Sequence, residues 1–213
     1  MGKNKLKRWA EMKTFGNVFE LDNQHKGKWN EYFQNDNPIY LELGCGRGEY
    51  TVGLARIYPD INFIGVDIKG ARLWKGAKTS VDEGLKNTAY IRDQIELIEN
   101  YFELNEVSGI WITFPDPQPQ ESREKKRLTS NRLLDKYLQF LKPNSQLHLK
   151  TDNTGLYEFT LEILKARKSK IYFNSPVVYE TPKGKEEALQ IETTYEKIFT
   201  EVGETIKYIH FEL

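Results

Sequence analysis

The stretch that decides the fold is Tyr40-Leu-Glu-Leu-Gly-Cys-Gly-Arg-Gly-Glu49. An apolar run that breaks into glycines and is followed by a helical pattern predicts a strand, a tight turn and a helix. Gly44, Gly46 and Gly48 carry no Cβ, so the backbone of the turn can approach a ligand closely. The next apolar run ends at Asp67, where a carboxylate can accept hydrogen bonds from both hydroxyls of a ribose. These features predict a cofactor that contains adenosine.

The glycine spacing and the position of Glu42 favour S-adenosylmethionine over a dinucleotide. NAD-type folds usually read G-x-G-x-x-G, whereas this chain reads G-x-G-x-G. A carboxylate two residues before the first glycine would repel a pyrophosphate, and it suits the amino group of a methionine moiety. An NAD-type cofactor is the second candidate, and a tight turn without any ligand would also use glycines.

The composition favours one cytoplasmic α/β domain without a metal site. A chain of 213 residues fits one such core, and its formal net charge is zero. No apolar run approaches the roughly 20 residues of a membrane span, and the basic N-terminus lacks the apolar core of a signal peptide. Cys45 is the single cysteine and the three histidines are far apart, so metal binding is not expected. A monomer and a homodimer are both compatible with the sequence.

Residues 1–35 are expected to form a basic and aromatic arm, and residues 36–213 a single domain. After Pro38, strand-length apolar runs alternate with helical patterns, which predicts a mostly parallel sheet with helices on both faces. The expected strands are 39–43, 62–67, 88–92, 109–113, 146–150, 171–173 and 207–212. The expected helices are 49–58, 70–83, 95–102, 133–141 (ended by Pro143) and 156–164, with a long loop and a short helix in 176–199. About seven strands in this order are typical of a Rossmann-like class I S-adenosylmethionine-dependent methyltransferase.

Acidic residues occupy five successive strand ends, at Glu42, Asp67, Asp93, Asp116 and Asp152. The carboxyl ends of parallel strands meet at one edge of the sheet, where ligands of such folds bind. We therefore expect these side chains to line one cofactor and substrate site. The alternative for any single one of them is a helix cap, and Asp93 precedes an expected helix.

The segment Phe114-Pro-Asp-Pro-Gln-Pro119 has three prolines in five residues, which stiffens a loop at a strand end. The basic run Arg123–Arg127 follows directly and predicts a phosphate-binding element beside this loop. A solvated surface loop is the alternative for the basic run.

Taken together, these motifs resemble those of the bacterial tRNA (guanine-N7)-methyltransferases, from about Ile39 to Phe199. The order and spacing of several short motifs make the resemblance specific. The motifs are Leu41-Glu-Leu-Gly-Cys-Gly46, Val66-Asp67, Asp93, Phe114-Pro-Asp-Pro117, Lys125-Lys-Arg-Leu128, Lys150-Thr-Asp-Asn153 and Thr193-Thr-Tyr-Glu196. The resemblance implies methyl transfer from S-adenosylmethionine to N7 of a guanine in the tRNA variable loop.

The resemblance also implies roles for individual residues. Glu42 would face the methionine end of the cofactor beside Gly44 and Gly46, Asp67 would bind the ribose, and Asp93 the adenine. Asp116 would lie where cofactor and guanine meet, and it is expected to act in catalysis together with Asp152. The residues implied for contact with the substrate are Gln120, Arg123, Lys125, Lys126, Arg127, Asp152, Thr193, Thr194, Tyr195 and Glu196.

The chain departs from the family pattern just after Asp116. Family members usually have tryptophan and lysine where this chain has Gln118 and Gln120, so a stacking surface and a positive charge are both missing there. Arg123 and Lys125 can replace the charge, because phosphates accept either side chain.

Guanine N7 carries a lone pair and no proton, so the implied transfer needs no general base. Alignment of N7 with the methyl donor can by itself supply roughly 7–11 kcal/mol of barrier reduction. Asp152 or Glu196 is expected to accept hydrogen bonds from guanine N1–H and the 2-amino group. The alternatives are a methyltransferase for a small molecule or a protein, and a non-catalytic S-adenosylmethionine- or RNA-binding protein.

Overall fold

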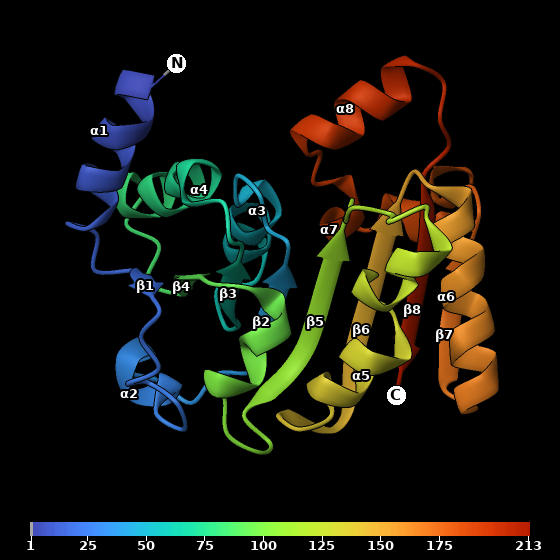
Figure 1. Ribbon diagram of the computed structural model, residues 1–213, viewed down its shortest axis with the longest axis horizontal. Coiled ribbons are helices and arrows are strands. Elements are labelled where there is room, and N and C mark those ends of the chain that lie inside the picture. Colours follow the sequence, from blue (N-terminus) through green and yellow to red (C-terminus); the bar gives the residue numbers. More distant parts are fainter. Residues whose placement is uncertain (1) are drawn as a thin grey trace.

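The computed structural model describes residues 2–213, with side chains from Leu6 onward, as one sheet flanked by helices (Figure 1). The strands are β1 (Val18–Glu20), β2 (Ile39–Leu43), β3 (Asn62–Val66), β4 (Thr88–Arg92), β5 (Val107–Thr113), β6 (Leu141–Thr151), β7 (Lys170–Ser175) and β8 (Lys207–Glu212). They lie in the order β1-β4-β3-β2-β5-β6-β8-β7. β8 is antiparallel to both of its neighbours, and the other adjacent pairs are parallel.

Helices cover both faces of this sheet. The α-helices are α1 (Gly2–Met12), α2 (Trp29–Phe33), α3 (Glu49–Ile57), α4 (Gly70–Asp82), α5 (Asn131–Tyr137), α6 (Thr154–Arg167), α7 (Glu187–Gln190) and α8 (Thr194–Glu201). The 3₁₀ helices are η1 (Ile95–Asn100), η2 (Glu121–Lys126), η3 (Val178–Glu180) and η4 (Pro182–Lys185). The cores place α2, η1, α5 and α6 on one face, and α3, α4 and α7 on the other. The expected α/β fold with a mostly parallel sheet is confirmed.

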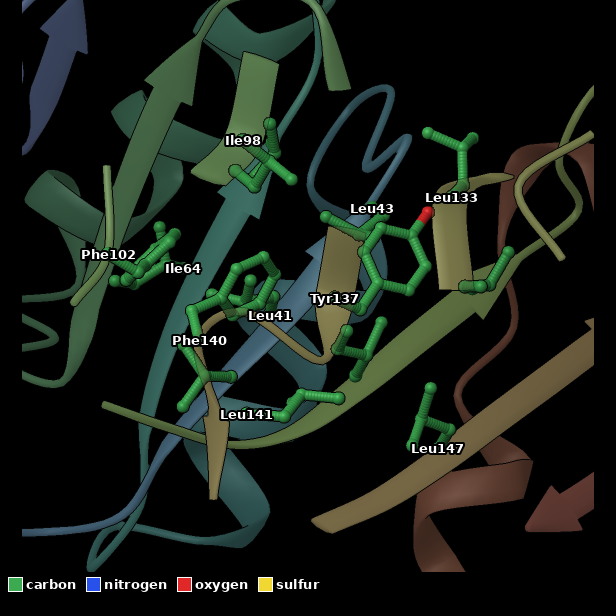
Figure 2. Close-up of a cluster of buried hydrophobic side chains, with 14 of the residues drawn as sticks. Leu41, Leu43, Ile64, Ile98, Phe102, Leu133, Tyr137, Phe140, Leu141 and Leu147 are labelled. Carbon is green, nitrogen blue, oxygen red and sulfur yellow. The ribbon is translucent and has the colours of Figure 1, made fainter. Parts of the chain in front are cut away.

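The larger core forms because successive side chains of a strand point to opposite faces. Leu41 and Leu43 of β2 point to the face that α5 and η1 cover (Figure 2). They pack there among Ile98, Leu133 and Tyr137, all fully buried. Such apolar burial contributes about 25 cal/mol per Å² of surface removed from water. This packing therefore stabilises the strands that carry the site.

The other residues of β2 point to the opposite face. Tyr40 packs against the core that contains Tyr50 and Leu54 of α3. Glu42 follows two residues later and points in the same direction, so its carboxylate lies between the sheet and α3. Because Glu42 is next to last in the strand, that carboxylate lies at the carboxyl edge of the sheet.

The sheet has eight strands, one more than the approximate count from the sequence. The additional strand is β1, which pairs with β4 from within residues 1–35. Met12 and Trp29 of the same segment are almost fully buried, and α1 packs against α4. The N-terminal segment thus adds an edge strand and two helices to the α/β body.

The region around Pro143 differs from the sequence prediction, which placed a helix up to residue 141. α5 ends at Tyr137, and β6 begins at Leu141 and continues past Pro143. The pairing of β6 with β5 shifts between Val107 and Gly109, and residues 142–144 are exposed at this irregularity. A proline is tolerated there because its missing N–H falls outside the regular ladder.

The segment 176–199 also has more structure than the expected loop and short helix. It contains η3, η4, α7 and most of α8. Figure 1 shows α8 beyond the carboxyl ends of β5 and β6, with α7 beside the ends of these strands. The segment therefore lies at the edge of the sheet where the acidic residues end their strands.

Candidate active site

A cavity of about 740 Å³ opens at the carboxyl ends of the parallel strands. All five of the acidic strand-end residues line it, as the sequence predicted. These are Glu42, Asp67, Asp93, Asp116 and Asp152. Its far wall comes from the α8 region, through Thr193, Tyr195 and Phe199. The cavity therefore has two walls. The first wall is formed by the strand ends and the glycine loop, and the second wall is formed by the α8 region, which is far away in the sequence.

The glycine loop forms the floor of the first wall. Gly44, Gly46 and Gly48 have φ values of +79°, +55° and +67°, a region that favours glycine. A Cβ at Gly44 or Gly46 would meet no protein atom closer than 3.7 Å, so these two leave the cavity side of the loop open. A Cβ at Gly48 would lie 2.9 Å from Cα of Gly76, so this glycine lets α3 approach α4. Two of the three glycines thus leave the cavity side of the loop open, and the third allows two helices to pack closely.

Glu42 is 3% exposed and is held by hydrogen bonds on both carboxylate oxygens. Oε2 accepts from the Thr51 backbone N–H at 2.8 Å and from its hydroxyl, and Oε1 accepts from the Thr113 hydroxyl at 2.8 Å. Burial raises the pKa of Glu42 to about 7, and these hydrogen bonds oppose the shift. A cationic group bound in the cavity would stabilise the ionised carboxylate.

Asp67 and Asp93 are held by nearby groups. The Asp67 carboxylate accepts from Gly46 N–H at 2.9 Å and from Lys69 N–H at 2.7 Å, which joins the end of β3 to the glycine loop. The Asp93 carboxylate accepts from Gln94 N–H at 2.7 Å and from the Tyr101 hydroxyl at 2.6 Å. The N-cap residue of η1 is Gln94, so Asp93 is not the cap that the sequence offered as the alternative.

The 114–118 loop carries Asp116, which lines the cavity. Phe114 and Gln118 adopt positive φ values of 47° and 44°. Arg127 braces this loop by donating to the carbonyls of Pro117 and Gln118, and its guanidinium lies over the Phe159 ring. The Arg127 side chain therefore stabilises the 114–118 loop, whereas its place in the basic run predicted a contact with tRNA.

The rest of the basic run forms η2, which begins after Gln120. Arg123, Lys125 and Lys126 are exposed, and none of them has an ion-pair partner among the described residues. Lys126 also lines the cavity, whereas Gln120, Arg123 and Lys125 lie outside its lining. These charges are free to meet an anionic surface at the mouth of the cavity.

The side chains of the Thr193–Glu196 motif point partly to the cavity and partly to other parts of the protein. Thr193 caps α8 by accepting from Glu196 N–H at 3.1 Å, and Tyr195 lies 5.7 Å from the Arg72 guanidinium across the cavity. The backbone N–H and hydroxyl of Thr194 donate to the Glu49 carboxylate, so Thr194 faces α3. Only Thr193 and Tyr195 of the motif line the cavity.

Asp152 and Glu196 were both expected to contact the nucleobase, and their surroundings differ. Glu196 is 2% exposed and is hydrogen-bonded to the Lys150 ammonium and the Tyr179 hydroxyl. Asp152 lines the cavity, and burial raises its pKa. Its carboxylate receives no hydrogen bond from another side chain among the described residues, so the geometry favours Asp152 for this contact.

Several lining residues were not predicted from the sequence. Lys69 and Arg72 enter from the start of α4, and Phe199 enters from α8, where its ring is stacked 6.3 Å from that of Phe114. The two basic residues follow Asp67 closely, so their position after a strand end was the available signal. Nothing in the local sequence pairs Phe199 with Phe114, because 85 residues separate them.

No group of three or more histidine, cysteine, aspartate or glutamate side chains that could hold a metal occurs among the described residues. Cys45 is buried, and burial raises the pKa of its thiol, which suits a packing role. Within residues 2–213, none of the helices combines the length and apolar character that crossing a membrane requires.

The doubly wound sheet, the open glycine loop and the carboxylates at the strand ends define a Rossmann-like, S-adenosylmethionine-dependent methyltransferase. A family model described as a putative methyltransferase matches residues 36–209. A tRNA (guanine-N(7)-)-methyltransferase of Christiangramia forsetii is 49% identical over 99% of this chain and 98% of its own. Another of Bacteroides thetaiotaomicron is 47% identical over 100% of this chain and 87% of its own. The chain belongs to the tRNA (guanine-N(7)-)-methyltransferase family.

Solved structures with lower sequence identity support the same fold. The 16S rRNA methyltransferase KamB superposes with a TM-score of 0.64 and is 14% identical, covering 87% of this chain and 92% of its own. An antibiotic-related methyltransferase superposes with a TM-score of 0.62 at 15% identity and the same coverage. At this identity the likeness concerns the fold alone.

Proposed function

We propose that this protein transfers the methyl group of S-adenosylmethionine to N7 of a guanine in the variable loop of tRNA. The main support for this proposal is the cavity. One of its walls is formed by strand ends suited to a cofactor, and the other comes from the α8 region. The exposed basic residues of η2 lie beside it. The names of relatives that match nearly the full length of the chain support the substrate. A tRNA substrate implies that the protein works in the cytoplasm.

The residues at the first wall fit the cofactor. Asp67 would accept from the ribose hydroxyls, Asp93 would lie at the adenine, and the open backbone at Gly44 and Gly46 leaves room for the ligand. Glu42 suits the positively charged methionine end, because a cation nearby favours its ionised form. Bound there, the cofactor supplies an activated methyl group on a sulfonium.

The residues at the second wall fit a purine. Asp152 would accept from N1–H and the 2-amino group of guanine, and its negative charge favours the positive charge that N7 methylation creates. Tyr195 and Phe199 offer ring faces, and base–aromatic stacking contributes about 1–3 kcal/mol per base. Asp116 lines the same cavity. The main work of the site is alignment and exclusion of water, since N7 needs no base.

The target guanine must leave its stacked position to reach this cavity, because a base inside a duplex is poorly accessible. Arg123, Lys125 and Lys126 of η2 would hold the phosphates that flank it. They compensate in part for Gln118 and Gln120, which stand where the family usually has tryptophan and lysine.

The test is to incubate the protein with labelled S-adenosylmethionine and unmodified bulk tRNA and to map the label by cleavage at N7-methylguanine. Label at one variable-loop guanine is the expected result. Cofactor binding without label on tRNA would contradict the proposal and point to a different substrate or a non-catalytic protein. Asp152→Ala is the companion variant, and it should bind the cofactor normally and methylate slowly.

A further inference from the structure

Lys150 is a fully buried lysine near the end of β6, directly behind the second wall of the cavity. A buried ammonium is costly unless its hydrogen bonds are satisfied, and burial lowers the pKa of Lys150. Lys150 is not among the residues that line the cavity. An apolar side chain of similar size would fill this space without the cost of burying a charge.

All three hydrogen bonds of the ammonium go to one short segment, 189–196. Nζ donates to the carbonyl of Leu189 at 2.9 Å, to the carbonyl of Ile191 at 3.2 Å and to Oε2 of Glu196 at 2.8 Å. The other oxygen of Glu196 accepts from the Tyr179 hydroxyl, so the ion pair is also held from η3. A lysine has three donors on one compact head, which lets a single side chain tie three oxygens together.

This segment is the one that carries Thr193 and Tyr195 to the cavity. Thr193 lies between the two anchored positions, Ile191 and Glu196, so fixing both of them fixes its backbone. The backbone carbonyl of Lys150 also accepts from Phe114 N–H at 2.8 Å, at the start of the 114–118 loop. Lys150 thus links the 114–118 loop to the α8 region.

We propose that Lys150 is a positioning residue for the nucleobase, an inference that rests on the proposed function. Its ammonium holds segment 189–196 so that Thr193 and Tyr195 face the base at the correct distance. It contacts neither the cofactor nor the base. A displacement of about 1 Å in such a wall can lower the rate about 100-fold, so a remote anchor of this kind matters for turnover.

The experiment compares Lys150→Met with the double variant Lys150→Met/Glu196→Gln. The single variant leaves a buried, unpaired carboxylate, whereas the double variant removes both charges and should recover much of the lost thermal stability. Neither variant restores the bonds to Leu189 and Ile191. We therefore expect kcat on tRNA to fall about 10–100-fold in both, with the Kd for S-adenosylmethionine within twofold of wild type.

Amide hydrogen exchange supplies a readout that does not depend on activity. Segment 189–201 should exchange at least about tenfold faster in both variants, while β2 to β5 keep their protection. Lys136→Met is the matched control, since it breaks a part-buried ion pair with Glu99 that has no contact with this segment. The control should leave kcat and exchange of 189–201 unchanged.

Two results would overturn the proposal. Wild-type kcat in Lys150→Met would show that the anchor is dispensable, and recovery of kcat in the double variant would show that only the unpaired Glu196 charge had mattered. If wild-type protein does not methylate tRNA, the proposed function fails, and the exchange measurement still decides whether Lys150 holds the segment.

Discussion

The two walls of the cavity are built in different ways. Glu42, Asp67 and Asp93 stand at strand ends, and their hydrogen-bond partners lie within 9, 21 and 8 residues in sequence. Tyr195 and Phe199 belong to a segment that reaches the cavity through contacts with residues more than 40 positions away, such as Lys150. The Glu42–Thr113 bond is the long-range exception on the first wall, and it runs between adjacent strands.

This difference shows how one fold can keep a cofactor and change a substrate. The first wall is built from strand ends and a glycine loop, so its formation follows from the formation of the sheet. The second wall belongs to a long connecting segment, and particular side-chain contacts hold that segment in place. Independent measurements of cofactor binding and of tRNA methylation can therefore separate the two walls.

The largest effect is expected at the first wall, from Asp67→Ala. The variant loses a carboxylate that would bind two ribose hydroxyls and that also holds Gly46 N–H. Two charge-assisted bonds at the lower end of their usual range, about 1.5–2 kcal/mol each, should raise the Kd for S-adenosylmethionine about 100–1000-fold. Isothermal titration checks this, with Asp60→Ala beyond the other end of β3 as the control. An unchanged Kd would remove Asp67 from the cofactor site.

The second effect concerns turnover at the other wall, from Asp152→Asn. The geometry of the side chain is kept and the negative charge is lost, so kcat on tRNA should fall about 30–100-fold. The Kd for S-adenosylmethionine should stay within twofold, and single-turnover rates give the measurement. Glu204→Gln, which removes a neighbouring charge outside the cavity lining, is the control. A parallel loss of cofactor affinity would mean that the two walls are not separable here.

The third prediction uses the raised pKa of Glu42, about 7 in the folded protein against an ordinary value near 4.5. The folded state holds this proton at pH values where the unfolded chain has released it, so the ligand-free protein loses stability as pH rises from about 4.5 to 7. Between pH 5 and pH 8 the loss should be about 2.5 kcal/mol in wild type relative to Glu42→Gln. Urea unfolding at pH 5 and pH 8 measures it, and equal pH dependence in both proteins would contradict the assignment.

The smallest effect is expected outside both walls, from Arg123→Ala/Lys125→Ala in η2. Loss of two exposed phosphate contacts should weaken tRNA binding about tenfold and reduce the salt slope of log Kd by about 2. Filter binding from 50 to 200 mM salt measures both, with exposed Lys86→Ala as the control. A salt slope equal to that of wild type would place the phosphate contacts elsewhere on the surface.

The sequence predicted the first wall almost completely. The glycine turn, the strand ends and their five carboxylates depend on local patterns, and the sheet brings them together by its topology. The sequence predicted secondary structure less accurately where long-range contacts override local preference. Pro143 was expected to end a helix, and the pairing of β6 with β5 placed it in a strand irregularity instead.

The basic run and the Thr193–Glu196 motif show the same limit at single residues. Their residue types predicted contact with the substrate, but the sequence could not say which side chains turn inward. Arg127 braces the 114–118 loop, Thr194 bonds to Glu49, and Glu196 pairs with Lys150. These partners are about ten or more residues away in the sequence, so the spacing of the motif does not predict the contacts.

The sequence by itself determined the class of fold, the family and the residues of the strand-end wall, because glycine spacing, strand-end carboxylates and apolar periodicity act over a few residues. Only the tertiary structure decided that Val18–Glu20 joins the sheet, that Asp152 and not Glu196 faces the cavity, and that Lys150 ties segment 189–196 to β6. These outcomes depend on which distant groups satisfy a buried charge or an unpaired backbone edge, and that is settled only when the chain packs.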